Sequence, residues 1–273
     1  MRPLHIAIGS TTSLPGEVER NLGQIGEFAR QAAADGADVL LTPELSASGY
    51  GGYPEVMATA ERPGDGPICR ALARQARETG VVIAAGFVEA PRYLSHYIVF
   101  PDGRFVVQRK HRTTPAEQPL EPWTPPSPKF EVFEIKGIRC ALTICADCGI
   151  EGLAEIFDAA GVELQFVPTG AGGRREERVT TEELRTEAGR EKYYYWLERV
   201  FFPGRSVLDC LVHRRAVAAV NLCGYDGRQF AHLGHGSIVT PMGEVPALIH
   251  GLPNLDRQRP LYTHAVVDFD EHI

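Results

Sequence analysis

The stretch CALTICADCGIEG, residues 140–152, decides how this chain folds. Its first residues, up to Ile144, form an apolar run that predicts a buried strand, and residues 153–160 have the pattern of a helix. Cys145 lies at the junction. At a helix N-terminus, exposed backbone N–H groups and the helix dipole favour a thiolate over a thiol. The pattern therefore predicts that Cys145 is displayed as a nucleophile, although free cysteines are also often buried residues without chemistry.

Strands and helices alternate on both sides of this stretch. Nearer the N-terminus, apolar spacing predicts strands at 4–9, 39–42 and 81–88 and helices at 17–34 and 68–78. The other expected strands are 97–100, 105–109, 129–135, 138–144, 163–167, 216–221 and 236–240, with turns at 101–103, 136–137 and 241–244. Mixed β-α-β units and hairpins predict an α/β protein with layered sheets covered by helices. We expect one domain over residues 1–273.

The composition excludes several classes of protein. The net charge is −7 and the Lys and Arg residues are scattered, which argues against nucleic acid or an anionic membrane as a partner. No uncharged run approaches the ~18 residues of a membrane span, and the first residues lead into a strand, not into a signal peptide. Six irregularly spaced cysteines are typical of reduced thiols, so we expect a cytoplasmic protein. We expect no cofactor and no metal, because His232 and His235 have no partner motif that completes a zinc site.

Two charged residues follow predicted strands and are candidates for chemistry. Glu44 comes directly after the strand at 39–42, where partial desolvation raises the pKa of a carboxyl group toward the range of a general base. Lys110 ends the strand at 105–109 and could stabilise an oxyanion or depress the pKa of a nearby thiol. Taken separately, Glu44 is as easily a helix-capping glutamate, and Lys110 is as easily a solvated lysine at the end of a strand.

The order of three short motifs is more specific than any one of them. Pro43-Glu44-Leu45 with Gly49-Tyr50, then Arg109-Lys110-His111, then Ile144-Cys145-Ala146-Asp147, resembles the nitrilase superfamily of carbon–nitrogen hydrolases. The resemblance extends over nearly the whole chain. It implies an αββα sandwich, in which two mixed β-sheets are flanked by helices.

The resemblance also implies roles for these residues. Cys145 would attack an amide or nitrile carbon, and Glu44 would move the proton. Lys110 and the backbone N–H of Ala146 would hold the oxyanion. The family has a second glutamate after the lysine, for which Glu117 fits best and Glu121 competes.

Further residues that match the family concern the substrate. Tyr50, Thr169 and Ala146 are expected to contact it. Asp147, where true nitrilases tend to have Trp-Glu after the cysteine, favours an amide or N-carbamoyl compound over a nitrile, and nitrile hydrolysis remains the alternative. Substrate specificity is expected to lie in residues 170–205, where an arginine could pair with a carboxylate of the substrate. The alternative interpretation, which fits this stretch equally well, is a solvated helix.

Two other functional classes fit part of the pattern. Cys145 and Cys148 form a Cys-x-x-Cys, as in dithiol redox proteins, but that function leaves Glu44 and Lys110 unexplained. A catalytically idle scaffold is disfavoured because the nucleophile, base and lysine are all present. We expect a small-molecule amide or carbamoyl substrate and, by analogy with the family, a homodimer or a higher homo-oligomer.

Overall fold

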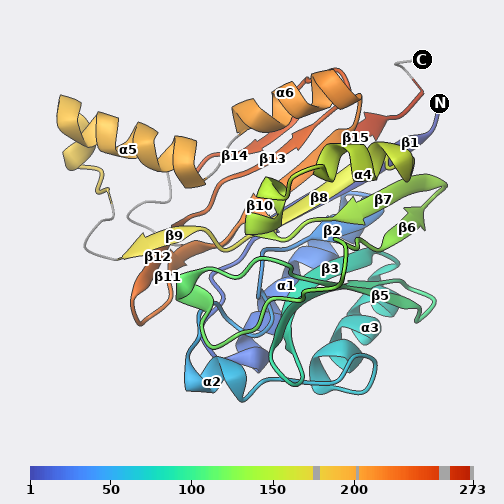
Figure 1. Cartoon of the computed structure of the whole chain (residues 1–273), viewed down its shortest axis with the longest axis horizontal. Helices are drawn as coiled ribbons and strands as arrows, with labels where there is room; N and C mark the ends of the chain where they lie inside the picture. The colour runs from blue at the N-terminus through green and yellow to red at the C-terminus, as the bar shows by residue number, and fades with distance from the viewer. Residues whose placement is uncertain (175–178, 201–202, 252–258, 271–273) are drawn as a thin grey trace.

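Two β-sheets of six strands each form the centre of the molecule (Figure 1). The computed structural model describes residues 1–174, 179–200, 203–251 and 259–270. In spatial order, the first sheet contains β15 (Leu261–Asp268), β1 (Pro3–Ser10), β2 (Val39–Leu41), β3 (Val82–Glu89), β4 (Tyr93–Val99) and β5 (Phe105–Arg109). The second contains β14 (Ala247–Ile249), β13 (Gly236–Val239), β10 (Ala216–Asn221), β8 (Leu164–Thr169), β7 (Ile138–Leu142) and β6 (Val132–Ile135). A small sheet contains β11 (Cys223–Tyr225), β12 (Phe230–Leu233) and β9 (Gly172–Arg174).

Helices cover the outer face of each large sheet. The helices are α1 (Val18–Ala34), α2 (Pro54–Met57), α3 (Pro67–Thr79), α4 (Leu153–Ala159), α5 (Glu187–Val200) and α6 (Pro203–His213), with short 3₁₀ turns η1 (Pro115–Glu117), η2 (Cys145–Gly149) and η4 (Glu183–Arg185). Helices α1 and α3 pack on the first sheet, and α4 and α6 pack on the second. The predicted αββα sandwich with two mixed sheets is confirmed.

The alternation of side chains along the strands builds these layers. In β1, Leu4, Ile6 and Ile8 point into the core between the sheets, whereas Ala7 packs against α1 and α3. Strand β10 repeats the pattern, with Ala218 directed between the sheets. Successive strand residues point to opposite faces, so a strand with apolar residues on both faces becomes the buried middle of a layered fold.

Local sequence signals fix the helix ends. Helix α3 begins with Pro67, whose fixed φ suits the first helical position, and ends at Gly80, which adopts the left-handed conformation at φ 73°. The buried carboxylate of Glu61 accepts the N–H groups of Ile68 and Cys69 at 2.8 and 2.9 Å. These contacts satisfy two of the orphan donors of the first turn.

Most elements expected near the N-terminus are present within a residue or two. The helix expected at 17–34 spans Val18–Ala34, and the 101–103 turn joins β4 to β5. The small sheet, β15, α2 and α6 were not predicted. Helix α5 lies in the stretch 170–205, for which a solvated helix was one of the two interpretations. Every helix in the described ranges is too short or too polar to cross a bilayer.

Candidate active site

Glu44 lies in a tight turn directly after β2. The hydroxyl groups of Thr42 and Ser46 bond to each other at 2.8 Å inside this turn, and Leu45 has a positive φ of 51°. A Cβ on Gly86 of β3 would lie 2.1 Å from the Leu45 nitrogen, so glycine at that position allows the turn to approach the neighbouring strand. The result is a fully buried Glu44 carboxyl group.

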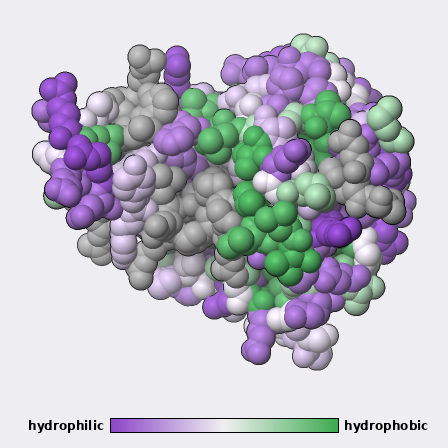
Figure 2. All heavy atoms as spheres, turned by 90° about the horizontal axis from the view of Figure 1, so that it is seen from above, coloured by the Kyte–Doolittle hydropathy of each residue, from purple (hydrophilic) through white to green (hydrophobic). Residues whose placement is uncertain are grey.

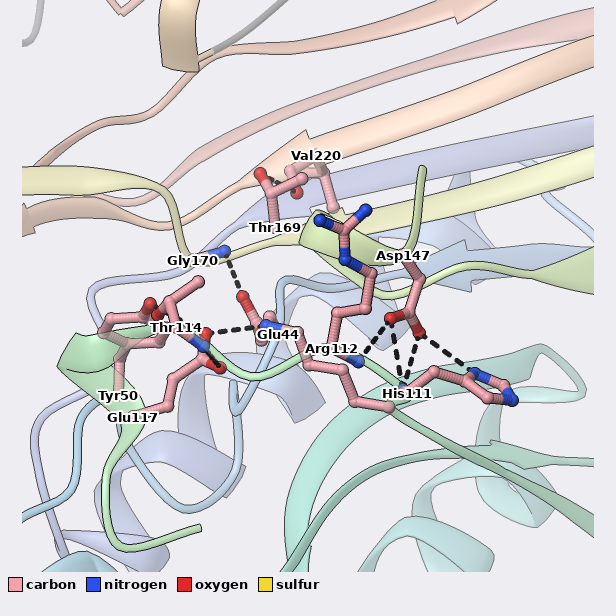
Figure 3. Close-up of polar contacts among 11 residues, drawn as sticks. Glu44, Tyr50, His111, Arg112, Thr114, Glu117, Asp147, Thr169, Gly170 and Val220 are labelled. Atoms are coloured by element: carbon pink, nitrogen blue, oxygen red, sulfur yellow. Dashed lines mark hydrogen bonds and ion pairs between the residues drawn. The ribbon is translucent and has the colours of Figure 1, made fainter. Parts of the chain in front are cut away.

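Lys110 joins two buried carboxylates. Its Nζ lies 2.5 Å from Glu44 Oε1 and 2.6 Å from Glu117 Oε1, and all three side chains are fully buried. Glu117 is held from two more directions, by the hydroxyl of Tyr50 at 3.0 Å and by the backbone N–H of Thr114 at 2.9 Å (Figure 3). Thr114 and Glu117 form a capping box at the start of η1. A single ammonium therefore bridges two carboxylates whose positions are fixed by the surrounding backbone.

Glu117 lies against Lys110, whereas Glu121 lies elsewhere, and the catalytic role of Glu117 stays a prediction. Glu121 is exposed and its backbone pairs with Tyr93 and Arg92 at the edge of the first sheet. The sequence Thr-Pro-Ala-Glu at 114–117 has the pattern of a capping box, a signal for the position of Glu117 that the sequence-based prediction did not use.

Burial and the neighbouring charges set the protonation of the cluster. Burial raises the pKa of Glu44 to about 7, against the lowering effect of Lys110 and with a further rise from Glu117. Burial acts to lower the pKa of Lys110, but the charges of Glu44, Cys145 and Glu117 outweigh it and hold this pKa above its usual value. Lys110 is therefore a permanent cation next to a carboxyl group that titrates near neutral pH.

Cys145 occupies a strained turn beside this cluster. Strand β7 ends at Leu142, and Cys145 then adopts a positive φ of 48° at the start of η2, a conformation that few non-glycine residues adopt. Burial raises the pKa of the Cys145 thiol well above its usual value, Glu44 and Glu117 raise it further, and Lys110 lowers it. These interactions place the thiol beside both carboxylates and the ammonium.

The protonation state expected for Cys145 was wrong. We expected the following helix to favour a thiolate, but the residue begins a short 3₁₀ turn, and α4 begins only at Leu153. The dominant influences on the thiol are burial and Glu44, both of which disfavour the negative charge. Cys145 is therefore a thiol in the resting site and needs a base before it can attack.

Asp147 locks the nucleophile turn to the segment that carries Lys110. Its buried carboxylate accepts the backbone N–H of His111 at 3.1 Å to each oxygen and that of Arg112 at 2.9 Å (Figure 3). The His111 ring lies 3.5 Å from the same carboxylate. We had assigned Asp147 only to substrate preference. Its contacts show that it holds the η2 turn and the end of β5 in register.

The remaining expected contact residues surround the same edge of the sheets. Tyr50 is buried against Glu117, and Ala146 follows Cys145 in the first turn of η2, where backbone N–H groups lack earlier partners. The hydroxyl of Thr169 bonds to the Val220 carbonyl at 3.3 Å. Of the stretch 170–205, which is expected to set specificity, the side chains of 174–178 and 196–205, which include five arginines, lie outside the described residues.

One site contact was not predicted. The backbone N–H of Gly170 donates to Glu44 Oε2 at 2.8 Å, so the second carboxylate oxygen is held by the chain after β8 (Figure 3). A backbone donor leaves no mark in a pattern of side chains, and only the position of a glycine after a strand end hinted at it.

Comparisons with known proteins agree with this site. The family model for carbon–nitrogen hydrolase matches residues 5–190. The chain is similar to "Hydrolase in pqqF 5'region" of Pseudomonas protegens, with 25% identity over 91% of this chain and 79% of the relative. It is also similar to the N-carbamoylputrescine amidase of Arabidopsis thaliana, with 25% identity over 85% of this chain and 77% of the relative.

Solved structures show the same fold. An amidase from Nesterenkonia sp. superposes with a TM-score of 0.75 at 20% identity, over 98% of this chain and 91% of that one. Other structures of that amidase contain acrylamide, or the acetamide moiety of fluoroacetamide added covalently at the active-site cysteine. The family model matches more than half of the sequence, so this chain belongs to the carbon–nitrogen hydrolase family.

Proposed function

We propose that the protein hydrolyses a non-peptide carbon–nitrogen bond, in an amide or an N-carbamoyl compound, through an acyl-cysteine intermediate. The observation that carries this proposal is the buried Lys110 ammonium bridging Glu44 and Glu117 beside the Cys145 thiol. A nucleophile, a base with a pKa near neutrality and a fixed cation are the three groups that acyl transfer requires.

The first half of the reaction forms the thioester. Glu44 takes the proton from Cys145 as the sulfur bonds to the carbonyl carbon. The carbonyl oxygen becomes an oxyanion, which Lys110 and the Ala146 N–H stabilise, a contribution of about 3–4 kcal/mol for one well-placed donor. An ammonium has three N–H donors, and two already point to carboxylates, so the third can face the oxyanion. Glu44 then gives its proton to the nitrogen, the carbon–nitrogen bond breaks, and ammonia or an amine leaves.

The second half releases the acid. Glu44, again a carboxylate, takes a proton from water as the hydroxide oxygen bonds to the thioester carbon. The carbon–sulfur bond breaks, and the proton returns to the Cys145 sulfur. Glu117 stays bound to Lys110, Tyr50 and Thr114 in this scheme and fixes the direction of the ammonium.

The substrate class is tested by ammonia or amine release. A suitable panel contains acrylamide, butyramide, N-carbamoylputrescine and butyronitrile. We expect turnover of at least one amide or carbamoyl compound and none of the nitrile, with activity lost in Cys145→Ala and Glu44→Gln. Turnover of butyronitrile alone would support the nitrile alternative, and activity that survives Cys145→Ala would refute the proposed mechanism.

The contacts of Cys148 support hydrolysis over a dithiol function. Its sulfur lies 3.4 Å from the Thr143 hydroxyl. Thr143 alternates with Leu142 and Ile144, which point into the core between the sheets, so Cys148 is directed toward the outer face of β7. Cys145 packs instead against the core between the sheets.

We further propose that two copies associate through the α6 face. Figure 2 shows apolar side chains gathered over α6, where Leu208, Leu211 and Val212 are exposed, and the nearby residues Met242 and Leu248 are also exposed. Contiguous apolar surface of this kind marks an interface. We expect a dimer by light scattering, and a monomer for Leu211→Asp; a wild-type monomer would refute the proposal.

Two broader proposals complete this account. Residues 1–273 act as one carbon–nitrogen hydrolase domain, because the core between the sheets draws on residues from Leu4 to Phe269. The six cysteines are free thiols, which supports a reducing compartment such as the cytoplasm.

A further inference from the structure

A short strap of chain, Thr169–Gly172, connects β8 to β9 and touches the base. Its Gly170 N–H donates to Glu44 Oε2 at 2.8 Å. One residue later, the Ala171 carbonyl accepts two side-chain donors, Asn221 Nδ2 at 2.8 Å and His232 Nδ1 at 3.2 Å. The strap is therefore held on one side by Glu44 and on the other by two residues from different sheets.

The strap fits closely against aromatic rings. A Cβ on Gly170 would lie 2.3 Å from the Tyr50 ring, and a Cβ on Gly172 would lie 2.6 Å from His232 Nδ1. The rings of Tyr50 and His232 meet edge to face, with centroids 5.3 Å apart. Because any larger side chain would collide, the strap has little room to shift while these rings stay in place.

Asn221 and His232 are built to act as donors here. Both are buried, Asn221 at the end of β10 and His232 in β12. Burial lowers the pKa of His232, so the imidazole is neutral near pH 7. With Nδ1 facing a carbonyl, the neutral ring has its proton on Nδ1. The Ala171 carbonyl therefore accepts a hydrogen bond from each of two buried side chains, Asn221 and His232.

We propose that Asn221 and His232 are positioning residues for the base: by fixing the Ala171 carbonyl they hold the Gly170 N–H on the Glu44 carboxylate. This inference rests on the proposed function, because it concerns the proton transfer of that reaction. Neither residue needs to touch the substrate.

Loss of the clamp has a defined electrostatic consequence. The Gly170 N–H lowers the pKa of Glu44 and also that of Cys145. The other titratable groups near Glu44 include Lys110, which lowers its pKa, and Glu117, which raises it. Cys145 and Tyr50 are also near, and Glu44 raises the pKa of both. If the strap moves away, both the base and the thiol become harder to ionise.

The test compares donors at position 232. His232→Leu removes the donor, His232→Asn keeps a donor at the same number of bonds from Cα, and His232→Gln moves it one bond further out. Asn221→Leu removes the second donor. His235→Leu is the control, because His235 is also buried but its Nδ1 accepts the Gly251 N–H at 2.9 Å. Its backbone carbonyl accepts the Asn221 N–H, and a change of the side chain leaves that carbonyl in place.

Two readouts are measured for each variant: kcat and KM against pH, and the rate at which iodoacetamide alkylates Cys145 against pH. We expect the leucine variants at 232 and 221 to lose about tenfold in kcat, the scale of one hydrogen bond to a charged group, with KM within about twofold. In these variants, the acid limb of the kcat–pH profile and the pH profile of Cys145 alkylation both shift to higher pH. His232→Asn restores most of the loss, and His235→Leu behaves like the wild type.

Several results would overturn the inference. The first is a kcat and an alkylation profile like those of the wild type in both His232→Leu and Asn221→Leu. The second is the same shift of the pH profiles in His235→Leu. The third is a kcat of His232→Asn no higher than that of His232→Gln. The Asn and Gln variants are both polar amides, so this comparison stands even where a leucine variant does not fold. Alkylation needs no substrate, so a shifted profile in a protein that hydrolyses no amide would refute the proposed function and leave the clamp intact.

Discussion

Replacing Lys110 with methionine removes the positive charge that links the two carboxylates of the site. Lys110→Met keeps a linear side chain of similar length, so the change is mainly electrostatic. Glu44 and Glu117 then share a buried space without the ammonium that now lies 2.5 and 2.6 Å from their oxygens. The structure therefore predicts a large loss of both stability and activity.

The magnitude follows from the burial of all three groups. At an effective dielectric constant of about 20, two unit charges about 4 Å apart interact by about 4 kcal/mol. Removing one partner of a buried ion pair costs about 3–5 kcal/mol of folding free energy, because the remaining charge is left uncompensated. Loss of an oxyanion donor also lowers kcat by about 10²–10³-fold. We expect a free energy of unfolding lower by about 3–5 kcal/mol near pH 8.

The deficit has a defined pH dependence. The pKa of Glu44 is about 7 in the folded protein, above its value in an unfolded chain, so its contribution to stability is present at low pH and lost as pH rises through about 7. Without Lys110, Glu44 loses the charge that lowers its pKa, so this pKa rises further. The variant then keeps losing stability above about pH 7, where the loss through Glu44 has ended in the wild type. The deficit of Lys110→Met is therefore larger at pH 8 than at pH 5.5, by up to ~1.4 kcal/mol per pH unit above about pH 7 for one proton.

Urea unfolding followed by circular dichroism at pH 5.5 and pH 8 measures this effect. Lys129→Met is the control, because the Lys129 side chain is exposed and its ammonium pairs with Glu131 at the surface. A Lys110→Met protein within about 1 kcal/mol of the wild type at pH 8, or a deficit that is equal at both pH values, would show that the reasoning is wrong.

The other predictions concern single groups. The wild-type kcat/KM should fall below about pH 7, because Glu44 must be ionised to act as the base; a pH–rate profile that is flat down to pH 5 would contradict this. Tyr50→Phe removes the 3.0 Å hydrogen bond to Glu117 and should cost about 1.5–3 kcal/mol in unfolding free energy, measured by urea titration; no change would mean that the hydroxyl contributes nothing. Cys148→Ser should keep amidase kcat within about threefold, because its sulfur contacts the Thr143 hydroxyl, whereas loss of activity would favour the dithiol function.

The layered fold could be predicted because it depends on side-chain periodicity. Strand β1 and helix α1 have apolar residues at strand and helical spacing, and both appear where the pattern placed them. The strands of the small sheet escaped prediction, since β9 and β11 have only three residues each and contain glycine. Such short segments are held by their neighbours and not by their own propensity.

The site shows the same division. Glu44, Lys110, Glu117 and Cys145 could be named because each carries a reactive side chain in a motif. The pKa of Cys145 could not, because it is set by the sum of burial and three charges that meet only in the folded chain. The Gly170 contact is equally invisible in the sequence, since a backbone N–H is common to almost every residue.

The central claim is that Cys145 receives the acyl group, and trapping that group tests it most directly. The wild-type protein is mixed with butyramide and quenched with acid during turnover, and the intact mass and the peptide map are then recorded by mass spectrometry. Acid stops the hydrolysis of the thioester, so we expect a butyryl adduct confined to Cys145 and no adduct in Cys145→Ala. An adduct on Cys148, or a butyryl group found nowhere while the wild type hydrolyses butyramide, would contradict the account.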